Sequence, residues 1–316
     1  MNILVIGSGA VGIGIGSSLL SQGVNISFLA SKNTARKMKE DGIKRTGLFT
    51  NYFFNPQEFN VYESYEEIPK KTFDYVLITS KTTSNDNISK KLNENRDILK
   101  DDFTILIIQN GFGNDQLFLR YFKTTEVYCA RIITGFTRPE RNISEVTVYT
   151  EPILLGSLQG ENIEHLKTIA DKITASGIKC ELSYELDKYL WAKMLYNCSL
   201  NALGAILDVT YGKLTENEYT KEIMNNIIDE IFDVIAASPY ETLWNTPDEY
   251  RKIFYTKLVP DTYNHYSSTH QDIKRKIETE IDTLNGKVIE LGEKYGVDVS
   301  TNKLIYNLIK AIESDF

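Results

Sequence analysis

Three polar residues recur every four positions in the otherwise apolar stretch LWAKMLYNCSLNALGAIL, residues 190–207. In a helix, at about 100° per residue, Lys193, Asn197 and Asn201 drift by only about 80° over two turns and form one narrow stripe. Because the rest of this helix is apolar and should be largely buried, the stripe needs hydrogen-bond partners inside the protein, and a bound ligand could supply them. The alternative is an interior helix whose amides cap backbone groups and whose lysine reaches water.

A glycine-rich segment near the start of the chain could bind a phosphate group. It directly follows the apolar run Ile3-Leu4-Val5-Ile6 and opens a helical segment that stops at Gly23, and residues 25–29 then predict a second strand. In a GxGxxG loop the first glycine makes the tight turn, the second lets backbone approach a pyrophosphate, and the third lets helix and strand pack closely. The helix N-terminus also attracts negative charge. This context favours dinucleotide binding over a simple turn, by Gly7, Ser8, Gly9, Ala10, Val11 and Gly12.

The residues after the second predicted strand bear on the identity of the dinucleotide. NAD enzymes usually place Asp or Glu there to hold the ribose 2′-hydroxyl. This chain has Ala30-Ser31-Lys32-Asn33, with Arg36 close behind, and the first acid is Glu40. Ser31 and Lys32 would not repel a 2′-phosphate, so NADP(H) is favoured; a solvated surface role for Lys32 is the alternative.

Two further apolar runs end in polar residues. Residues 75–79 lead into Ser80-Lys81, and residues 104–108 lead into Gln109-Asn110-Gly111. Open α/β sheets bind ligands at the carboxyl ends of their strands, so Lys81 and Asn110 are candidates for contact with the cofactor. Taken singly, each is more often explained as an exposed loop lysine or an ordinary Asn-Gly turn, but their coincidence at one sheet edge narrows that difference.

A carboxylate lies among apolar positions later in the chain. We predict one helix after His270 whose apolar face reads Ile273, Ile277, Ile281, Leu284, Val288 and Leu291, and Glu280 falls on that face. A buried carboxylate is costly unless it is paired, so Glu280 is a better site candidate than the exposed acids, although a salt bridge to an internal lysine is equally compatible. Ser267-Ser268 upstream could cap the helix.

The elements that must position these residues divide into two groups. Up to about residue 182 strand-like and helical segments alternate, whereas from Tyr184 onward helical spacing dominates. We therefore predict an α/β N-terminal Rossmann-type dinucleotide-binding domain, residues 1–182, followed by an all-α C-terminal domain, residues 183–316, that carries the substrate-binding and catalytic groups.

Composition narrows the partners. The 316 residues carry a net charge of −8 without a basic run, which argues against nucleic acid or an anionic membrane and favours a small molecule. The three cysteines, Cys129, Cys180 and Cys198, are widely spaced in apolar surroundings, as expected of reduced cysteines in a cytoplasmic protein. We expect no signal peptide and no membrane span. We also expect no zinc site, since His265 and His270 lack a third ligand.

Together these pieces resemble the ketopantoate reductase (2-dehydropantoate 2-reductase) family over nearly the whole chain. The landmarks appear in order: GSGAVG from Gly7, SK at Ser80, NG at Asn110, LWAKMLYNCSLNAL from Leu190, SSTHQD from Ser267 and TEIDTLNG from Thr279. The resemblance implies NADPH-dependent reduction of ketopantoate to pantoate, in the pathway to pantothenate and coenzyme A. A homodimer is a possible assembly.

The resemblance also implies roles for individual residues. Lys193 would be the general acid, while Asn197, Asn201 and Ser268 would hold the substrate. Asn110 would touch both cofactor and substrate, and Glu280 would act in catalysis near the reacting end of the cofactor.

Several positions depart from the family pattern. Ala30 stands where an arginine often binds the 2′-phosphate, and Thr269 and His270 replace a Met-Leu pair. Ile277 replaces an arginine, and His265 and Tyr211 replace substrate-side asparagines. These changes keep two alternatives open: a reductase of a different branched 2-oxo acid, and a non-catalytic NADP-binding regulatory protein. Retention of Lys193 and Glu280 speaks against the second.

Overall fold

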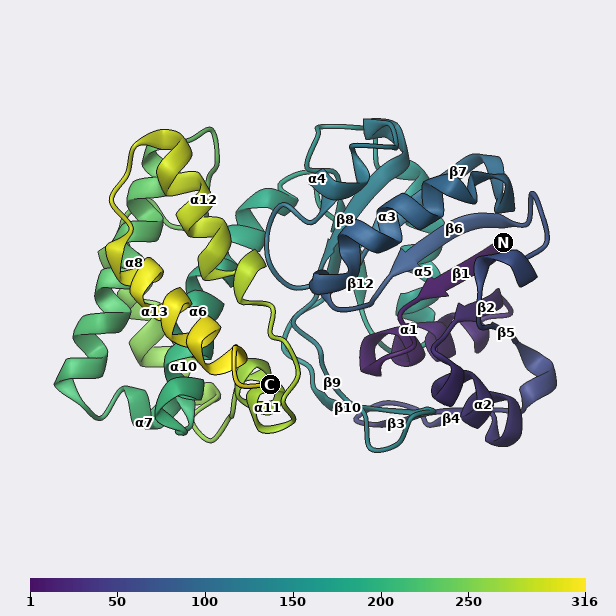
Figure 1. Cartoon of the computed structure of the whole chain (residues 1–316), viewed down its shortest axis with the longest axis horizontal. Coiled ribbons are helices and arrows are strands. Elements are labelled where there is room, and N and C mark those ends of the chain that lie inside the picture. Colours follow the sequence, from purple (N-terminus) through teal and green to yellow (C-terminus); the bar gives the residue numbers. More distant parts are fainter. The chain divides into compact units, whose positions relative to one another are not determined.

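The computed structural model describes all residues, 1–316, and the chain forms two compact units. The first unit comprises Met1–Gln109 and Asn114–Leu186; the second comprises Asn110–Gly113 and Asp187–Phe316. Figure 1 shows the strands of the first unit in purple to teal and the helices of the second in green to yellow. The α/β unit followed by a helical unit is the fold class that the sequence predicts.

The first unit is built on an eight-stranded sheet in the order β12-β11-β8-β7-β6-β1-β2-β5. From β5 to β8 neighbouring strands are parallel, whereas β11 pairs with β8 in the antiparallel sense. Ile3, Leu4 and Val5 are fully buried, as expected of a strand covered on both faces. The strands are β1 (Asn2–Ile6), β2 (Asn25–Leu29), β5 (Asn60–Tyr62), β6 (Phe73–Ile78), β7 (Leu99–Ile107), β8 (Val127–Arg131), β11 (Ile153–Gly156) and β12 (Cys180–Leu182).

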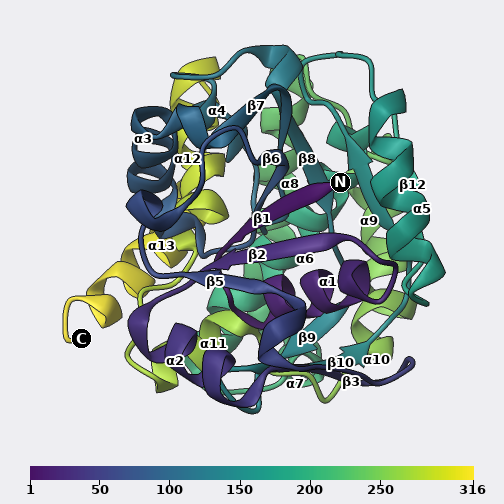
Figure 2. The same cartoon turned by 90° about the vertical axis from the view of Figure 1, so that its right-hand side faces the viewer.

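Helices cover both faces of this sheet because the right-handed crossovers from β1 to β2 and from β6 to β7 run in opposite directions across it. The helices α1 (Ala10–Leu20) and α5 (Lys167–Ala175) pack together on one face, and α3 (Asn85–Glu94) and α4 (Asp115–Phe118) pack together on the other (Figure 2). The helix α2 (Lys32–Asp41) follows β2. Short helical turns connect the rest: η1 (Pro56–Glu58), η2 (Tyr65–Glu67), η3 (Thr82–Ser84), η4 (Arg96–Ile98), η5 (Thr124–Glu126) and η6 (Glu164–Leu166).

A second, four-stranded sheet packs against α1 in the order β4-β3-β10-β9. Its strands are β3 (Ile43–Gly47), β4 (Tyr52–Phe54), β9 (Gly135–Thr137) and β10 (Ile143–Val148). A Cβ on Gly14 would lie 2.4 Å from the ring of Phe136, and one on Gly16 would lie 2.6 Å from the ring of Phe28. The glycines of α1 therefore let this helix approach both sheets closely.

The second unit is helical and is organised around the long helix α6 (Leu186–Leu207), whose first residue still belongs to the first unit. Trp191, Met194, Leu195 and Leu200 are at most 1% exposed, which confirms a largely buried helix, although its last residue, Leu207, is 46% exposed. The others are α7 (Tyr211–Leu214), α8 (Glu218–Ala237), α9 (Pro247–Ile253), η7 (Phe254–Leu258), α10 (Val259–Asp261), α11 (Ser268–Lys274), η8 (Ile281–Thr283), α12 (Asn285–Tyr295) and α13 (Ser300–Glu313).

The single helix predicted after His270 is wrong. The helix α11 ends at Lys274, and Lys276 takes a positive φ of 51°, the left-handed conformation that commonly terminates helices. The Thr279 N–H then donates to the Glu313 carboxylate and not to a helical carbonyl (2.7 Å). Ile277 is 40% exposed, so it is not part of the predicted apolar face, and Glu280 precedes the short turn η8.

Two other features concern the chain as a whole. The three cysteines are buried and form no disulfide, and burial raises the pKa of each thiol. None of the helices combines the length and apolar character that a membrane crossing requires.

Candidate functional site

The glycine loop has the geometry that a phosphate-binding turn requires. Gly7 has a φ of +104°, and a Cβ there would lie 2.2 Å from the Ser80 backbone nitrogen. A Cβ on Gly12 would lie 2.2 Å from the Gly7 carbonyl oxygen, so the third glycine permits close packing. By contrast, a Cβ on Gly9 would meet no atom within 4 Å. Backbone at Gly9, the residue before α1, is therefore open to a ligand at the helix N-terminus.

Hydrogen bonds tie the glycine loop to the carboxyl ends of β6 and β7. The Thr79 hydroxyl donates to the Gly7 carbonyl oxygen (2.7 Å). The Gln109 side-chain nitrogen donates to the Ser80 carbonyl oxygen (2.8 Å), and Gln109 also forms a reciprocal amide pair with Asn85 (2.9 and 2.8 Å). The half-buried Lys81, predicted to contact the cofactor, thus follows a strand end that is fixed to the loop.

An open pocket of about 290 Å³ lies beside α2. Its lining residues are Lys32, Asn33, Arg36, Lys39, Glu40 and Glu63. Lys39 pairs with Glu63 (3.1 Å), whereas Ser31 and Lys32 are exposed at the start of the helix, where Ser31 is the N-cap residue. The pocket contains none of the polar stripe of α6. Its cations suit the phosphate of a 2′-phosphorylated ribose, and its two carboxylates limit that preference.

In the second unit, three of the predicted residues form one hydrogen-bonded chain. The Lys193 ammonium donates to the Asn110 side-chain oxygen (2.6 Å), and the Asn110 side-chain nitrogen donates to a Glu280 carboxylate oxygen (3.3 Å). All three residues are half-buried. The amide of Asn110 therefore joins a cation and a carboxylate and restricts the orientation of both.

The Asn110-Gly111 turn is held against η8 within the same unit. Gly111 has a φ of +89°, and a Cβ there would lie 2.6 Å from the Thr283 carbonyl oxygen. The Phe112 N–H donates to that oxygen (3.2 Å), and the Phe112 ring packs on Trp191, with ring centroids 4.8 Å apart. This turn is therefore more than an ordinary Asn-Gly turn, because it fixes Asn110 relative to both α6 and η8.

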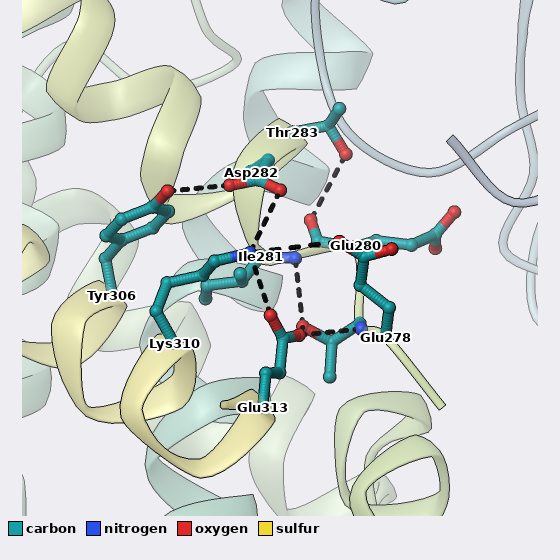
Figure 3. A network of polar contacts seen from close by, with 9 residues as sticks. Glu278, Glu280, Ile281, Asp282, Thr283, Tyr306, Lys310 and Glu313 are labelled. Carbon is teal, nitrogen blue, oxygen red and sulfur yellow. Dashed lines mark hydrogen bonds and ion pairs between the residues drawn. The ribbon is translucent and has the colours of Figure 1, made fainter. Parts of the chain in front are cut away.

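Residues 278–283, which carry Glu280, are anchored on α13 (Figure 3). The Glu313 carboxylate accepts hydrogen bonds from the Thr279 backbone nitrogen (2.7 Å) and hydroxyl (2.6 Å) and pairs with Lys310 (2.8 Å). The Thr283 hydroxyl donates to the Glu280 carbonyl oxygen (3.2 Å). Glu280 is thus positioned by the contacts of its neighbours in the chain.

The remaining stripe residues lie further along α6. Asn197 is 9% exposed and Asn201 is 4% exposed, and the structure gives the Asn197 side chain no hydrogen-bond partner within the protein. Ser268 is exposed on the first turn of α11 and makes no hydrogen bond to the Lys193 chain. Its neighbour Ser267 is the helix cap, accepting from the His270 N–H (3.0 Å) and donating to the Asn201 carbonyl oxygen (2.9 Å).

The sequence did not identify some residues that support the predicted site residues. Tyr211 donates to the Asn201 side-chain oxygen (2.6 Å), although its sequence signal was only a departure from the family pattern. Thr283 and Glu313 support residues 278–283, and neither has a local signal, because their partners are set by the tertiary fold.

The two units together have the features of one class of protein. A glycine loop at a strand-helix junction, with strand ends tied to it, is the dinucleotide site of a Rossmann-type unit. A lysine held by an amide, on the same helix as two buried amides, can protonate and orient a carbonyl compound. These features define a nicotinamide-dependent oxidoreductase.

Family models described as "Ketopantoate reductase PanE/ApbA" and "Ketopantoate reductase PanE/ApbA C terminal" match residues 3–160 and 185–313. A 2-dehydropantoate 2-reductase of Aquifex aeolicus is 35% identical over 99% of this chain and 97% of its own length. The chain belongs to the ketopantoate reductase family.

Solved structures share the fold over the full length. A PanE/ApbA family ketopantoate reductase from Ralstonia eutropha superimposes with a TM-score of 0.87 at 23% identity, covering 100% of this chain and 99% of the other. A D-mandelate dehydrogenase, solved with NADH and anilino(oxo)acetate, gives 0.86 at 22% identity with the same coverage. At these identities the likeness concerns the fold alone.

Proposed function

We propose that this protein reduces 2-dehydropantoate (ketopantoate) to pantoate with NADPH, the step that leads toward pantothenate and coenzyme A. The observation that carries the proposal is the hydrogen-bonded chain Lys193–Asn110–Glu280, with Asn197 and Asn201 on the same helix as the lysine. The full-length similarity to a 2-dehydropantoate 2-reductase supports the same substrate.

The first unit fits a nicotinamide dinucleotide. A pyrophosphate fits the glycine loop for three reasons. Space is open at Gly9, Gly7 and Gly12 allow close backbone packing, and the first turn of α1 contains no acidic residue. We assign Gly7, Ser8, Gly9, Ala10, Val11 and Gly12 to this role, Ser31 and Lys32 to the adenosine end, and Lys81, Asn110 and Glu280 to the nicotinamide end. When bound, the reduced cofactor supplies the hydride that adds to the ketone carbon.

Lys193 supplies the proton in this scheme. As hydride adds to the carbon, negative charge develops on the ketone oxygen, and an ammonium beside that oxygen stabilises the charge and then transfers a proton to it. The Asn110 side-chain oxygen accepts a hydrogen bond from one N–H of the Lys193 ammonium, and this limits the directions of the other two N–H groups. Glu280, on the other side of the same amide, balances the lysine charge in a partly buried site.

The substrate would be held by Asn197, Asn201 and Ser268. Two amides and a hydroxyl can bind the carboxylate and the hydroxyl of the 2-oxo acid, which orients the ketone for attack. Asn197 suits this role because its amide is nearly buried and has no protein partner.

The test is oxidation of NADPH and NADH with a panel of 2-oxo acids, including 2-dehydropantoate and 3-methyl-2-oxobutanoate, which lacks the terminal hydroxyl. We expect the highest kcat/KM with 2-dehydropantoate and NADPH. Efficient turnover of another branched acid without turnover of 2-dehydropantoate would establish a different substrate on the same fold. Tight NADPH binding without turnover of any acid would instead favour the non-catalytic regulatory protein.

Three expectations about the surroundings of the enzyme stay predictions. A homodimer can be checked by light scattering of the purified protein, and the cytoplasmic location by cell fractionation. Absence of nucleic-acid binding is expected from the net charge of −8 and can be checked by a gel-shift assay.

A further inference from the structure

Asn201 is held from two directions inside the second unit. The Tyr211 phenol contacts the Asn201 side-chain oxygen at 2.6 Å, and the Ser267 hydroxyl donates to the Asn201 carbonyl oxygen at 2.9 Å. Tyr211 and Asn201 are each 4% exposed, and Ser267 is 1% exposed. Both contacts are therefore shielded from competing water.

The direction of the Tyr211 hydrogen bond follows from the chemistry of a buried phenol. Burial, with a smaller contribution from Tyr196, raises the pKa of Tyr211, so the phenol keeps its proton. That proton needs an acceptor, because an unsatisfied buried donor costs about 1–3 kcal/mol. The amide oxygen of Asn201 is the acceptor that the structure provides. A flipped amide would place an NH₂ group opposite the phenol and leave its proton without this acceptor.

The phenol occupies one of the two lone-pair positions of the Asn201 oxygen and fixes the orientation of the amide, so the amide presents its NH₂ group as a donor to a ligand. The structure gives this nitrogen no partner within the protein. We propose that Tyr211 is a positioning residue for the 2-oxo acid: it fixes the orientation of the Asn201 amide so that the NH₂ group donates a hydrogen bond to the substrate. This inference rests on the proposed function, and it requires the substrate to present an acceptor oxygen at Asn201.

The Tyr211 ring is itself held in place. It packs against Tyr196, with ring centroids 5.7 Å apart, and against His265, at 5.2 Å. The Tyr211 backbone N–H also donates to the His265 carbonyl oxygen (3.1 Å). Tyr211 and His265 are thus neighbours, and the ring that supports Asn201 has little freedom to move.

The test compares Tyr211→Phe with Tyr196→Phe. The first substitution removes only the hydroxyl on Asn201, while the second removes a hydroxyl of the same aromatic group that contacts the Thr262 hydroxyl (2.5 Å). We expect Tyr211→Phe to raise the KM for 2-dehydropantoate about 3- to 10-fold, the effect of one neutral hydrogen bond, with kcat and the KM for NADPH within twofold of wild type. Tyr196→Phe should leave all three constants unchanged.

A second arm asks whether Tyr211 acts through Asn201. In an Asn201→Ala background, Tyr211→Phe should produce no further rise in KM, since the amide that it positions is gone. A general loosening of the unit would still raise KM in that background and would overturn the inference, as would an unchanged KM in the single variant. If the wild-type protein turned over no 2-oxo acid, the proposed function itself would be wrong. If the wild type is active but Tyr211→Phe gives an unchanged KM, or raises KM in the Asn201→Ala background, only the inference about Tyr211 is wrong.

Discussion

Replacing Glu313 with alanine should loosen the segment that carries Glu280. The Glu313 side chain is 7% exposed, accepts from both the N–H and the hydroxyl of Thr279, and pairs with Lys310 at 2.8 Å. Thr279 is fully buried, and it immediately precedes Glu280 in the chain. The substitution therefore removes the acceptor for two buried donors next to a proposed catalytic carboxylate.

The expected magnitude follows from these contacts. Each buried donor left without a partner costs about 1–3 kcal/mol, so Glu313→Ala should lower the free energy of unfolding of the helical unit by about 2–5 kcal/mol. This corresponds to a fall in melting temperature of roughly 5 to 15 °C. A shift of Glu280 by a fraction of an ångström to 1 Å should also lower kcat by roughly 10- to 100-fold.

Thermal unfolding and steady-state NADPH oxidation measure the two effects. Glu313→Gln keeps an oxygen that can accept from Thr279, so it should restore most of kcat while losing the ion pair with Lys310. Glu293→Ala is the matched control, because it removes an exposed carboxylate that lies 3.8 Å from another α13 lysine, Lys303, and does not touch the segment. If Glu313→Ala retained wild-type kcat, the proposed link from Glu313 to Glu280 would be wrong.

The same carboxylate predicts a pH dependence of stability. Burial by itself would raise the pKa of Glu313, but hydrogen bonds from Lys310 and Thr279 outweigh burial and hold the pKa below its ordinary value. A lowered folded-state pKa contributes stability above the unfolded-state pKa, near 4.3, and this contribution is lost as the pH falls through the folded-state pKa. Wild type should therefore lose more stability than Glu313→Gln between about pH 6 and about pH 3 in denaturant titrations; equal losses would contradict the assignment.

Three further predictions concern the reaction and the cofactor. Lys193→Ala should lower kcat by roughly 10² or more while leaving the Kd for NADPH nearly unchanged in fluorescence titration; an unaltered kcat would exclude lysine as the acid. Gly9→Ala should weaken NADPH binding without a change in melting temperature, because its Cβ enters open space, whereas Gly12→Ala should lower the melting temperature, because its Cβ would lie 2.2 Å from a carbonyl oxygen. Lys32→Ala combined with Arg36→Ala should raise the KM for NADPH by roughly tenfold or more and leave the KM for NADH within about twofold; equal effects on both would exclude a 2′-phosphate contact.

The first strands and the first helix of the first unit could be predicted from the sequence because their signals are local. A continuous apolar run, a GxGxxG loop and a glycine stop predicted β1 and α1, and the second strand was predicted with the bounds that the structure has, Asn25–Leu29. The second sheet was not foreseen as a separate layer, since β3 pairs in parallel with β10, about a hundred residues later in the chain. Nothing in the local pattern of either strand specifies that partner.

The region after His270 shows where periodicity misleads. Apolar residues at helical spacing predicted one long helix, but the Thr279 N–H binds Glu313 and the Thr279 hydroxyl accepts from the Ile281 N–H (3.3 Å). These hydrogen bonds compete with those of a helix, as threonine side chains often do. Glu280 was selected as a carboxylate on the apolar face of that helix, and this local structure is wrong; its role in the site stays a prediction.

The turn at Asn110–Gly113 shows that its position after a strand does not predict which unit it packs in. By sequence it follows β7 of the first unit, yet its contacts place it in the second, because Phe112 packs on Trp191 and on Tyr240 and binds the Thr283 carbonyl oxygen. The chain Lys193–Asn110–Glu280 therefore belongs to one unit, and its internal geometry is a property of the helical unit alone. It follows that the proposed proton donor and its orienting groups can be tested by variants of the second unit without altering the glycine loop that would hold the cofactor.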